Sequence, residues 1–307
     1  MSGAVELVEV GPRDGLQNES CILTTAQKVE LIERSLAAGS RRIEVASFVN
    51  PRRVPQMADA EAVCAALKPR HAVTTIGLVL NRRGAERALL TNVDELGAVA
   101  SASDGFGIAN QGRTSDETVR DAIEIIELAK AAGRRAQVTI SVAFGCPFDG
   151  EVEPERVAGI ARRLARAGPR EIALGDTIGV AAPADVARVM RAVSETVPDM
   201  KLRCHFHDTR NTGVANAWAA LEQGAATLDA SLGGIGGCPF APGASGNVAT
   251  EDLLYTLDRA GIRTGLHLGT LIDNVAWLSA TMGRSLPGRL SRVPRFPSAT
   301  SNAIADR

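Results

Sequence analysis

Two histidines separated by one residue are the first chemical feature of the chain. They lie in the stretch 201–209, KLRCHFHDT, which is predicted to be a strand. Because a strand repeats its side-chain direction every second residue, His205 and His207 leave the backbone on the same face. Two imidazoles on one face, followed at once by Asp208, provide half of a metal site. Such a pair also occurs as packed or solvated histidines without a metal, so a metal site is indicated only if further ligands lie nearby.

The composition excludes several classes of partner. The 307 residues carry 34 Lys and Arg against 35 Asp and Glu, a formal net charge of −1. Such a chain has no field to attract nucleic acid or an anionic membrane. The 5 cysteines are widely spaced without a C-x-x-C pair, which indicates free thiols in a reducing compartment. With no signal-peptide pattern and no apolar run of about 18 residues, we expect a cytoplasmic protein.

Short β-branched runs alternate with longer stretches of helical period along the chain. The predicted strands are 5–10, 42–47, 72–80, 95–101, 136–144, 171–174, 201–209 and 227–232. The predicted helices are 26–38, 57–67, 84–90, 116–132, 154–167, 183–196, 213–223 and 248–260. A polar, glycine-rich loop is expected at 103–115.

Eight strand–helix units favour a (β/α)8 TIM barrel of the α/β class. Strands that alternate with helices pair in parallel through right-handed crossovers, and about 250 residues suffice to close such a barrel. A doubly wound open sheet is the rival, but the first strand–helix turn holds no G-x-G-x-x-G sequence. We expect a catalytic barrel at 1–265 and an additional C-terminal helix at 266–284. This helix covers the barrel or a partner subunit of a homo-oligomer, and 285–307 forms a loosely held tail.

The barrel supplies partners for the two histidines. Reactive groups of this fold collect at the carboxyl ends of the strands, and Asp14 follows the first strand. Asp14, His205 and His207 then form a two-imidazole, one-carboxylate set, to which Asn247 adds an amide oxygen. Such ligands suit Mg, Mn or Zn with open positions, and equally a non-haem Fe(II) site. Alternatively, Asp14 is a turn residue paired with Arg13, and Asn247 caps the helix expected from residue 248.

Further polar side chains are predicted at the same mouth. Arg13 could stabilise an enolate or carboxylate oxygen, and Glu44 on the next strand could hold it in place. Otherwise Arg13 forms a surface ion pair and Glu44 fills the barrel interior. Ser47 and Asp176 end their strands there and, with Arg13 and Glu44, are candidate substrate-binding residues.

Cys238 lies in a loop rich in glycine and proline, 233–247. Such a loop can approach a ligand closely and move like a lid. A thiol on it can exchange a proton with a substrate carbon or act as a nucleophile. Cys204 is predicted to face the helices instead, away from the mouth.

The chain resembles the 3-hydroxy-3-methylglutaryl-CoA lyase family. The resemblance rests on VEVGPRDGLQNE at 8–19, IEVASF at 43–48, LGDTIG at 174–179, HFHDT at 205–209 and GGCPFAPGASGNVATED at 236–252. The loop at 238–247 is the specific part. The Arg-Asp-Gly and His-x-His elements are shared with isopropylmalate and homocitrate synthases.

The resemblance implies cleavage of a 3-hydroxy-3-methylglutaryl-CoA-like substrate to acetyl-CoA and a keto acid such as acetoacetate. By analogy a divalent metal, Mg or Mn, is held by Asp14, His205, His207 and Asn247. Arg13 stabilises the thioester enolate, His205 assists deprotonation of the hydroxyl, and Cys238 protonates the enolate carbon. This division agrees with the needs of retro-aldol cleavage, namely an activated hydroxyl, an electron sink and a proton donor.

Four places depart from the family pattern. Ser20 stands where a lysine near the CoA phosphates is common, and Ala173 replaces a substrate-contacting serine. The segments 77–81 and 105–112 also differ, which bears on the acyl group and on the CoA contacts. Two other functions remain open: a Claisen-type acyl-CoA synthase of the same superfamily, or a catalytically silent binding barrel.

Overall fold

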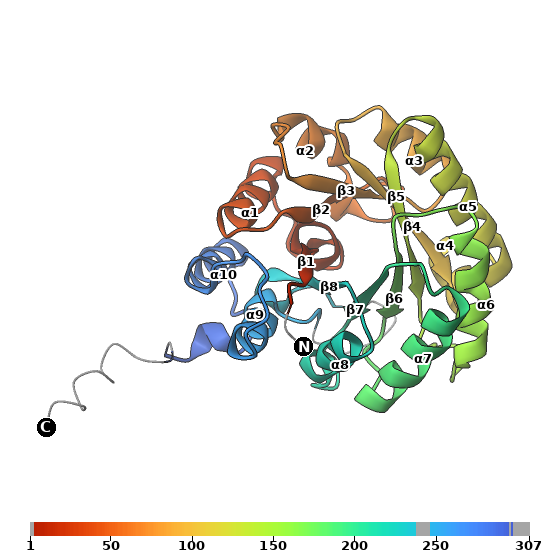
Figure 1. Ribbon diagram of the computed structural model, residues 1–307. Helices are drawn as coiled ribbons and strands as arrows, with labels where there is room; N and C mark the ends of the chain where they lie inside the picture. The colour runs from red at the N-terminus through yellow and green to blue at the C-terminus, as the bar shows by residue number, and fades with distance from the viewer. Residues whose placement is uncertain (1–2, 238–245, 295, 297–307) are drawn as a thin grey trace, which may run out of the picture.

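The computed structural model, which describes residues 3–237, 246–294 and 296, contains a closed barrel of eight parallel strands. Each strand pairs with the next in the sequence, and the first pairs with the last through Glu6–Thr227 and Leu7–Leu228. Figure 1 shows the strands at the centre with the helices arranged around them. The (β/α)8 barrel predicted from the alternating pattern is confirmed.

The strands and helices follow one another in strict alternation for most of the chain. The strands are β1 (Glu6–Glu9), β2 (Arg42–Ser47), β3 (Thr74–Leu78), β4 (Glu95–Ser101), β5 (Arg135–Ser141), β6 (Ile172–Asp176), β7 (Leu202–Phe206) and β8 (Thr227–Ala230). The helices are α1 (Thr25–Ala37), α2 (Ala60–Ala66), α3 (Arg82–Leu89), α4 (Asp104–Gln111), α5 (Ser115–Ala131), α6 (Pro154–Ala165), α7 (Pro183–Thr196), α8 (Gly213–Glu222), α9 (Thr250–Arg259) and α10 (Leu268–Met282).

The segment expected to be a glycine-rich loop at 103–115 instead contains the helix α4. Its start is set by Ser103, whose hydroxyl accepts a hydrogen bond from the Phe106 amide. Its end is set by Gly112, which takes the left-handed conformation that favours glycine. Two buried residues, Phe106 and Gly107, then pack the helix against the barrel, so capping and burial outweigh the low helix propensity of its glycines.

The helix expected at 57–67 is shorter than predicted. A short 3₁₀ turn, Pro55–Met57, precedes α2. This turn is anchored to the β1 loop and to α1, because the Gln56 side chain donates to the Glu19 carbonyl and Lys28 donates to the Gln56 carbonyl. These two bonds hold the β2 loop against the first loop of the barrel.

The barrel has an apolar outer layer and a charged interior. Alternate residues of each strand face the helices and form the main hydrophobic core, while the inward residues include Glu44 and Glu95. Two buried arginines cross the lumen: Arg42 pairs with Glu95 and Glu171, and Arg203 pairs with Asp229 and Glu171. Buried charges persist only when each is paired. The lumen is therefore filled by an ionic network.

Helix α10 packs on its own barrel. Figure 1 shows it beside α1 and α9. Leu271, Val275 and Leu278 are buried against residues of these helices, and the Asn274 amide donates to the Arg34 carbonyl. The chain after it stays attached as far as residue 290, because the Asp252 carboxylate accepts from the backbone amides of residues 289 and 290. None of the described helices is long and apolar enough to cross a membrane.

A buried carboxyl group ties β1 to the turn after β8. Glu9 accepts hydrogen bonds from the Gly11 and Leu232 amides and from the Thr250 hydroxyl. Burial raises the pKa of Glu9 to about 7 even though these hydrogen bonds oppose the shift. Burial likewise raises the pKa of the neighbouring Glu251 to about 8, and its carboxylate accepts from the Gly233 amide.

The raised pKa of Glu9 predicts a pH-dependent stability. Between pH 4.5 and 7 the folded chain keeps a proton that the unfolded chain has released, so stability falls as pH rises through this window. Glu9→Gln mimics the protonated form, and we expect its free energy of unfolding to match the native value at pH 4 and to exceed it by up to ~3 kcal/mol at pH 8. Urea unfolding at the two pH values measures the difference.

The exposed Glu195 on α7 provides the matched control, because Glu195→Gln removes a carboxylate that lies in solvent. It should not change the pH dependence. A Glu9→Gln protein that is destabilised equally at both pH values would show that the folded chain holds this group as a carboxylate.

Candidate active site

The structure brings Asp14, His205 and His207 together at the carboxyl end of the barrel. Asp14 lies in a π-helical turn, Gly11–Gly15, directly after β1, and the two histidines lie at the end of β7. Asp14 Oδ2 is 3.8 Å from Nε2 of each histidine, and the three candidate ligand atoms all lie within 4.8 Å of one another. One oxygen and two nitrogen donors at this spacing fit a single divalent cation.

A carboxylate that the sequence analysis missed orients the first histidine. Asp229 Oδ2 is 3.1 Å from His205 Nδ1, and its other oxygen accepts from the buried Arg203. Burial alone would lower the pKa of His205, but this hydrogen bond and the Asp14 carboxylate raise it above its ordinary value. With Nδ1 engaged, Nε2 is the atom that His205 offers to the centre of the site. Such a carboxylate–histidine pair is common behind metal ligands.

The second histidine has a different environment. Its ring centre is 5.1 Å from that of His205, and its Nδ1 has no hydrogen-bond partner among the residues described. Burial lowers the pKa of His207 to about 4, and the nearby His205 adds to the effect. His207 is therefore neutral over the physiological range, which is the form that binds a metal.

Arg13 and Glu44 fix the carboxylate of the site. Glu44 accepts from Arg13 Nε at 2.6 Å, and Arg13 Nη1 donates to Asp14 Oδ1 at 2.6 Å. Arg13 is buried, so the alternative of a surface ion pair does not hold. Burial would raise the pKa of Asp14, but the guanidinium and the two histidines hold it well below its usual range. Asp14 is thus a carboxylate whose second oxygen, Oδ2, faces the imidazoles.

Asn247 lies beside the cluster. Its amide nitrogen donates to Asp14 Oδ2 at 2.9 Å and to the Ile235 carbonyl at 3.0 Å, and its backbone pairs with His207 in an isolated bridge. The alternative in which Asn247 caps the following helix is wrong, because α9 begins at Thr250 and its N-cap is Ala249. A role as fourth ligand stays a prediction.

The remaining predicted residues take different positions. Asp176 is buried and its carboxylate accepts from the Val180 and Ala181 amides, so in this structure it shapes the loop after β6. Ser47 is buried, and its hydroxyl has no partner among the described residues. Cys204 packs against Met190 on α7, as its place in the strand predicted. Cys238 lies outside the described residues, although the preceding Gly237 lines the cavity over the site.

A wide cavity opens above these groups. Its volume is about 1160 Å³, and Asp14, His205, His207 and Asp229 line its floor. It extends to the loops after β2, β3 and β4. Pockets for drug-sized ligands span roughly 300–1,000 Å³, so this cavity has room for a large substrate.

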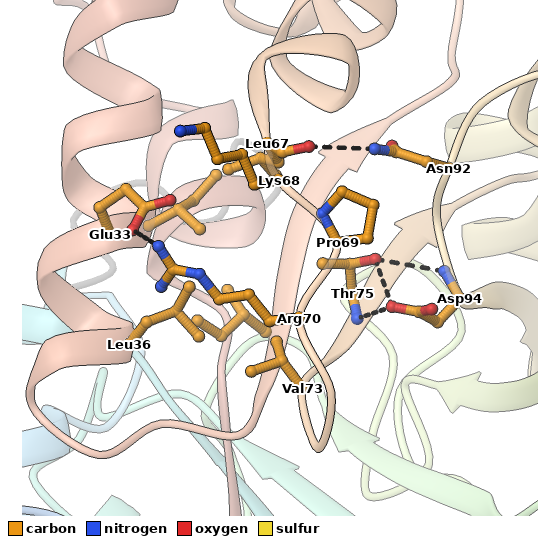
Figure 2. A pocket seen from close by; sticks show the side chains of 12 residues that line it. Glu33, Leu36, Leu67, Lys68, Pro69, Arg70, Val73, Thr75, Asn92 and Asp94 are labelled. Atoms are coloured by element: carbon orange, nitrogen blue, oxygen red, sulfur yellow. Dashed lines mark hydrogen bonds and ion pairs between the residues drawn. The ribbon is translucent and has the colours of Figure 1, made fainter.

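A second cavity lies at the opposite end of the barrel and has a volume of about 30 Å³, close to that of one water molecule. Figure 2 shows Arg70, Asn92 and Asp94 paired with neighbouring side chains or with the backbone, while no bond is drawn from Lys68 to the other lining residues. The Asp94 carboxylate accepts from Thr75, and Arg70 pairs with Glu33. This cavity offers little space and few free polar groups, so the chemistry belongs to the mouth of the barrel.

Comparison with known proteins gives the family of the chain. The HMGL-like family model matches residues 4–276. The chain belongs to the HMGL-like family. It is 46% identical to (R)-citramalyl-CoA lyase of Chloroflexus aurantiacus over 98% of each chain. It is 42% identical to 3-hydroxy-3-isohexenylglutaryl-CoA/hydroxymethylglutaryl-CoA lyase of Pseudomonas aeruginosa, over 94% of this chain and 96% of the relative.

A crystal structure of hydroxymethylglutaryl-CoA lyase from Pseudomonas aeruginosa has the same architecture. Its TM-score is 0.91 at 41% identity, covering 95% of this chain and 97% of that one. The family relationship therefore holds for the whole barrel of this HMGL-like chain, including the loops that supply Asp14, His205 and His207.

Replacing the orienting carboxylate should weaken metal binding. In Asp229→Asn the group beside His205 Nδ1 loses its charge, and we expect the dissociation constant for Mn²⁺ to rise about 10- to 100-fold. Titration calorimetry on the metal-free protein measures this constant directly. The control is Asp258→Asn on the exposed face of α9, which removes the same charge far from the site. Equal affinities of the two variants would argue against an orienting role, provided that both melt near the native temperature.

Proposed function

We propose that this chain is a divalent-metal-dependent carbon–carbon lyase that cleaves 3-hydroxy-3-methylglutaryl-CoA or a close 3-hydroxyacyl-CoA. Its products are acetyl-CoA and the matching keto acid. The observation that carries the proposal is the cluster of Asp14, His205 and His207 beside a buried arginine, on the floor of a cavity large enough for an acyl-CoA. Lyases acting on such substrates among the relatives support it.

The metal would be held by Asp14, His205 and His207, with Asn247 as the fourth protein ligand. The donor set fits a hard or borderline cation, and we propose Mg²⁺ or Mn²⁺. Such a cation, when bound, lowers the pKa of the substrate hydroxyl and orients the substrate. Use of the Asn247 oxygen requires its amide group to turn, because its nitrogen now faces Asp14.

Cleavage breaks the bond between carbons 2 and 3 of the acyl chain. The hydroxyl loses its proton and its oxygen becomes the carbonyl of the keto acid, while the electron pair stays on the acetyl fragment as a thioester enolate. We assign assistance in this deprotonation to His205, whose Nδ1 is engaged with Asp229 and whose Nε2 faces the centre of the site beside Asp14.

We assign stabilisation of the enolate oxygen to Arg13. Its guanidinium lines the cavity beside Asp14, and Glu44 fixes its orientation from below. A fixed positive group where charge develops lowers the barrier, because it needs no reorganisation during the reaction. The enolate then takes a proton at carbon 2, and we assign this proton to Cys238 on the basis of the sequence motif.

The residues of the cavity wall bear on which acyl group the substrate carries. Ala173, which replaces a serine of the family pattern, is buried in β6 next to Gly175 of the cavity wall. The methyl side chain of Ala173 cannot donate a hydrogen bond to the free carboxylate of the substrate's acyl group. Leu78 and Val99 also line the cavity and favour a hydrocarbon substituent. The 3-hydroxy-3-methylglutaryl thioester and the shorter citramalyl thioester are therefore the substrates to be compared.

The reaction can be tested directly. Incubation with 3-hydroxy-3-methylglutaryl-CoA and with citramalyl-CoA should release acetyl-CoA in the presence of Mg²⁺ or Mn²⁺, and a chelator should abolish the release. Coupled detection of acetyl-CoA by citrate synthase measures both rates, and their kcat/KM ratio defines the acyl specificity. If neither thioester yields product with metal present, the proposal is rejected. Release of CoA from acetyl-CoA and a 2-oxo acid would instead support the Claisen-type alternative.

Arg13→Lys tests the electrostatic role. A lysine keeps the charge but cannot bind Glu44 and Asp14 at the same time, since it lacks the planar fork of donors. We expect kcat to fall about 10²- to 10³-fold. The matched control, Arg166→Lys at the exposed end of α6, should keep native kinetics. An Arg13→Lys enzyme with native kcat would show that charge alone suffices at this position.

A further inference from the structure

One arginine lies in the barrel lumen directly below the candidate metal site. Arg203 comes two residues before His205 on β7, so the two side chains leave the strand on the same face. Arg203 is only 1% exposed and is not among the residues that line the large cavity. Any effect of Arg203 on the chemistry must therefore pass through the side chains that it contacts.

Arg203 contacts two carboxylates that belong to different parts of the site. Its Nε donates to Asp229 Oδ1, and its Nη2 lies 3.9 Å from Glu44 Oε1. The second oxygen of Asp229 is 3.1 Å from His205 Nδ1, and the second oxygen of Glu44 accepts from Arg13 Nε at 2.6 Å. The Arg203 guanidinium thus stands behind a candidate metal ligand and behind the arginine assigned to the enolate.

These contacts close into a ring at the mouth of the barrel. Asp14 accepts from Arg13 through Oδ1, and its Oδ2 lies 3.8 Å from His205 Nε2. Basic and acidic side chains therefore alternate around a ring of six, in the order His205, Asp229, Arg203, Glu44, Arg13 and Asp14. A shift of one member displaces its neighbours on both sides, so the metal ligands and Arg13 are not positioned independently.

Arg203 is also tied to the charged layer beneath the ring. Its Nη1 lies 3.6 Å from Glu171 Oε1, and the same oxygen pairs with Arg42 at 2.6 Å. Burial would lower the pKa of Arg203, but Asp229 and the nearby glutamates raise it above its ordinary value. The guanidinium therefore stays charged, and it is held from below while it contacts the two ring carboxylates.

We propose that Arg203 is a positioning residue that couples the two halves of the active site. Through Asp229 it fixes the imidazole of His205, and through Glu44 it fixes the guanidinium of Arg13. The inference rests on the proposed function, in which these two groups act on the same substrate. A guanidinium suits this task because its planar fork of N–H donors reaches two carboxylates at once, which the single ammonium group of a lysine cannot do.

The ordinary alternative is that Arg203 only balances the negative charge of the lumen. Arg42 distinguishes the two roles, because it is an equally buried arginine that shares Glu171 with Arg203. Its ion pairs are with glutamates outside the ring, among them Glu95, and it has none with either ring carboxylate next to Arg203. Loss of charge balance affects both arginines alike, whereas coupling requires Arg203 alone.

The test compares Arg203→Lys with the matched control Arg42→Lys, since both changes keep the charge of the lumen. Calorimetric titration of the metal-free protein with Mn²⁺ reports on His205, and thioester cleavage at saturating Mn²⁺ reports on Arg13. We expect Arg203→Lys to raise the dissociation constant for Mn²⁺ about 10-fold and to lower kcat about 10- to 100-fold. KM should change by less than about threefold, because Arg203 does not line the cavity. The control should keep all three constants, even where its melting temperature falls equally.

A double-mutant cycle separates positioning from general destabilisation. Because Arg203 acts on the metal ligand through Asp229, Arg203→Lys should add little to the loss of Mn²⁺ affinity that Asp229→Asn causes alone. Additive losses of Mn²⁺ affinity in the double variant would show that Arg203 does not act through this carboxylate.

A second pair of variants covers the case in which Arg203→Lys does not fold. Arg203→Gln with Glu171→Gln removes one charge of each sign, and Arg42→Gln with Glu171→Gln makes the same change as its control. Only the first pair should weaken Mn²⁺ binding. Native Mn²⁺ affinity in the Arg203 variants, or equal losses in the Arg42 controls, would overturn the coupling. The Mn²⁺ titrations need no substrate, so a protein that cleaves neither thioester rejects the proposed function while metal binding still decides the coupling.

Discussion

The ion pair between the buried Arg203 guanidinium and Asp229 is the interaction on which the site depends. The guanidinium holds Asp229, which orients His205, and it approaches Glu171, which also pairs with Arg42 deeper in the lumen. Buried ion pairs add little net stability, but removal of one partner leaves an uncompensated charge and is strongly destabilising. The network therefore specifies side-chain positions more than it stabilises the fold. The buried carboxylates Glu44, Glu95, Glu171 and Asp229 each pair with an arginine, and the partly buried Asp14 pairs with Arg13 beside the two histidines.

The two candidate histidine ligands, although they share one face of one strand end, are made unequal by their neighbours. His205 has a carboxylate behind it, and its pKa is raised, whereas His207 has no partner for Nδ1 among the described residues and its pKa lies at about 4. The Asp229 carboxylate thus favours the charged form of one imidazole, whereas burial disfavours the charged form of the other. The asymmetry comes from β8, because Asp229 is delivered by that strand and lies beside His205 but not beside His207. The spacing of two residues places His205 and His207 on the same face of β7, whereas Asp229 on the adjacent strand β8 makes their environments different.

The sequence predicted the barrel because eight strand–helix units leave few alternatives, and it placed Asp14, His205 and His207 together because strand ends of a barrel converge. It did not predict Asp229. An Asp inside an apolar strand could be identified only from the register between β7 and β8, where Arg203 pairs with Thr227 and sets Asp229 level with His205. It also missed α4, where glycines suggested a loop although Ser103 and Gly112 provide both caps. In both cases a tertiary relationship, strand register or burial, decided what local composition could not.

Convergence of three loops gives the cluster its shape. The turn after β1, the turn after β8 and the segment at Asn247 meet with almost no space between them: a Cβ on Gly236 would lie 2.8 Å from Gly15 Cα and 2.6 Å from the Asn247 amide nitrogen. Gly236 also has a φ of 105°, which side chains rarely adopt. Glu9 joins the same turns from outside the lumen by accepting from the Gly11 and Leu232 amides. Asp14 is thus fixed from inside the lumen by Arg13 and from outside through the backbone of its own turn. The candidate metal site therefore requires the glycines at these loop contacts as well as the ligands themselves.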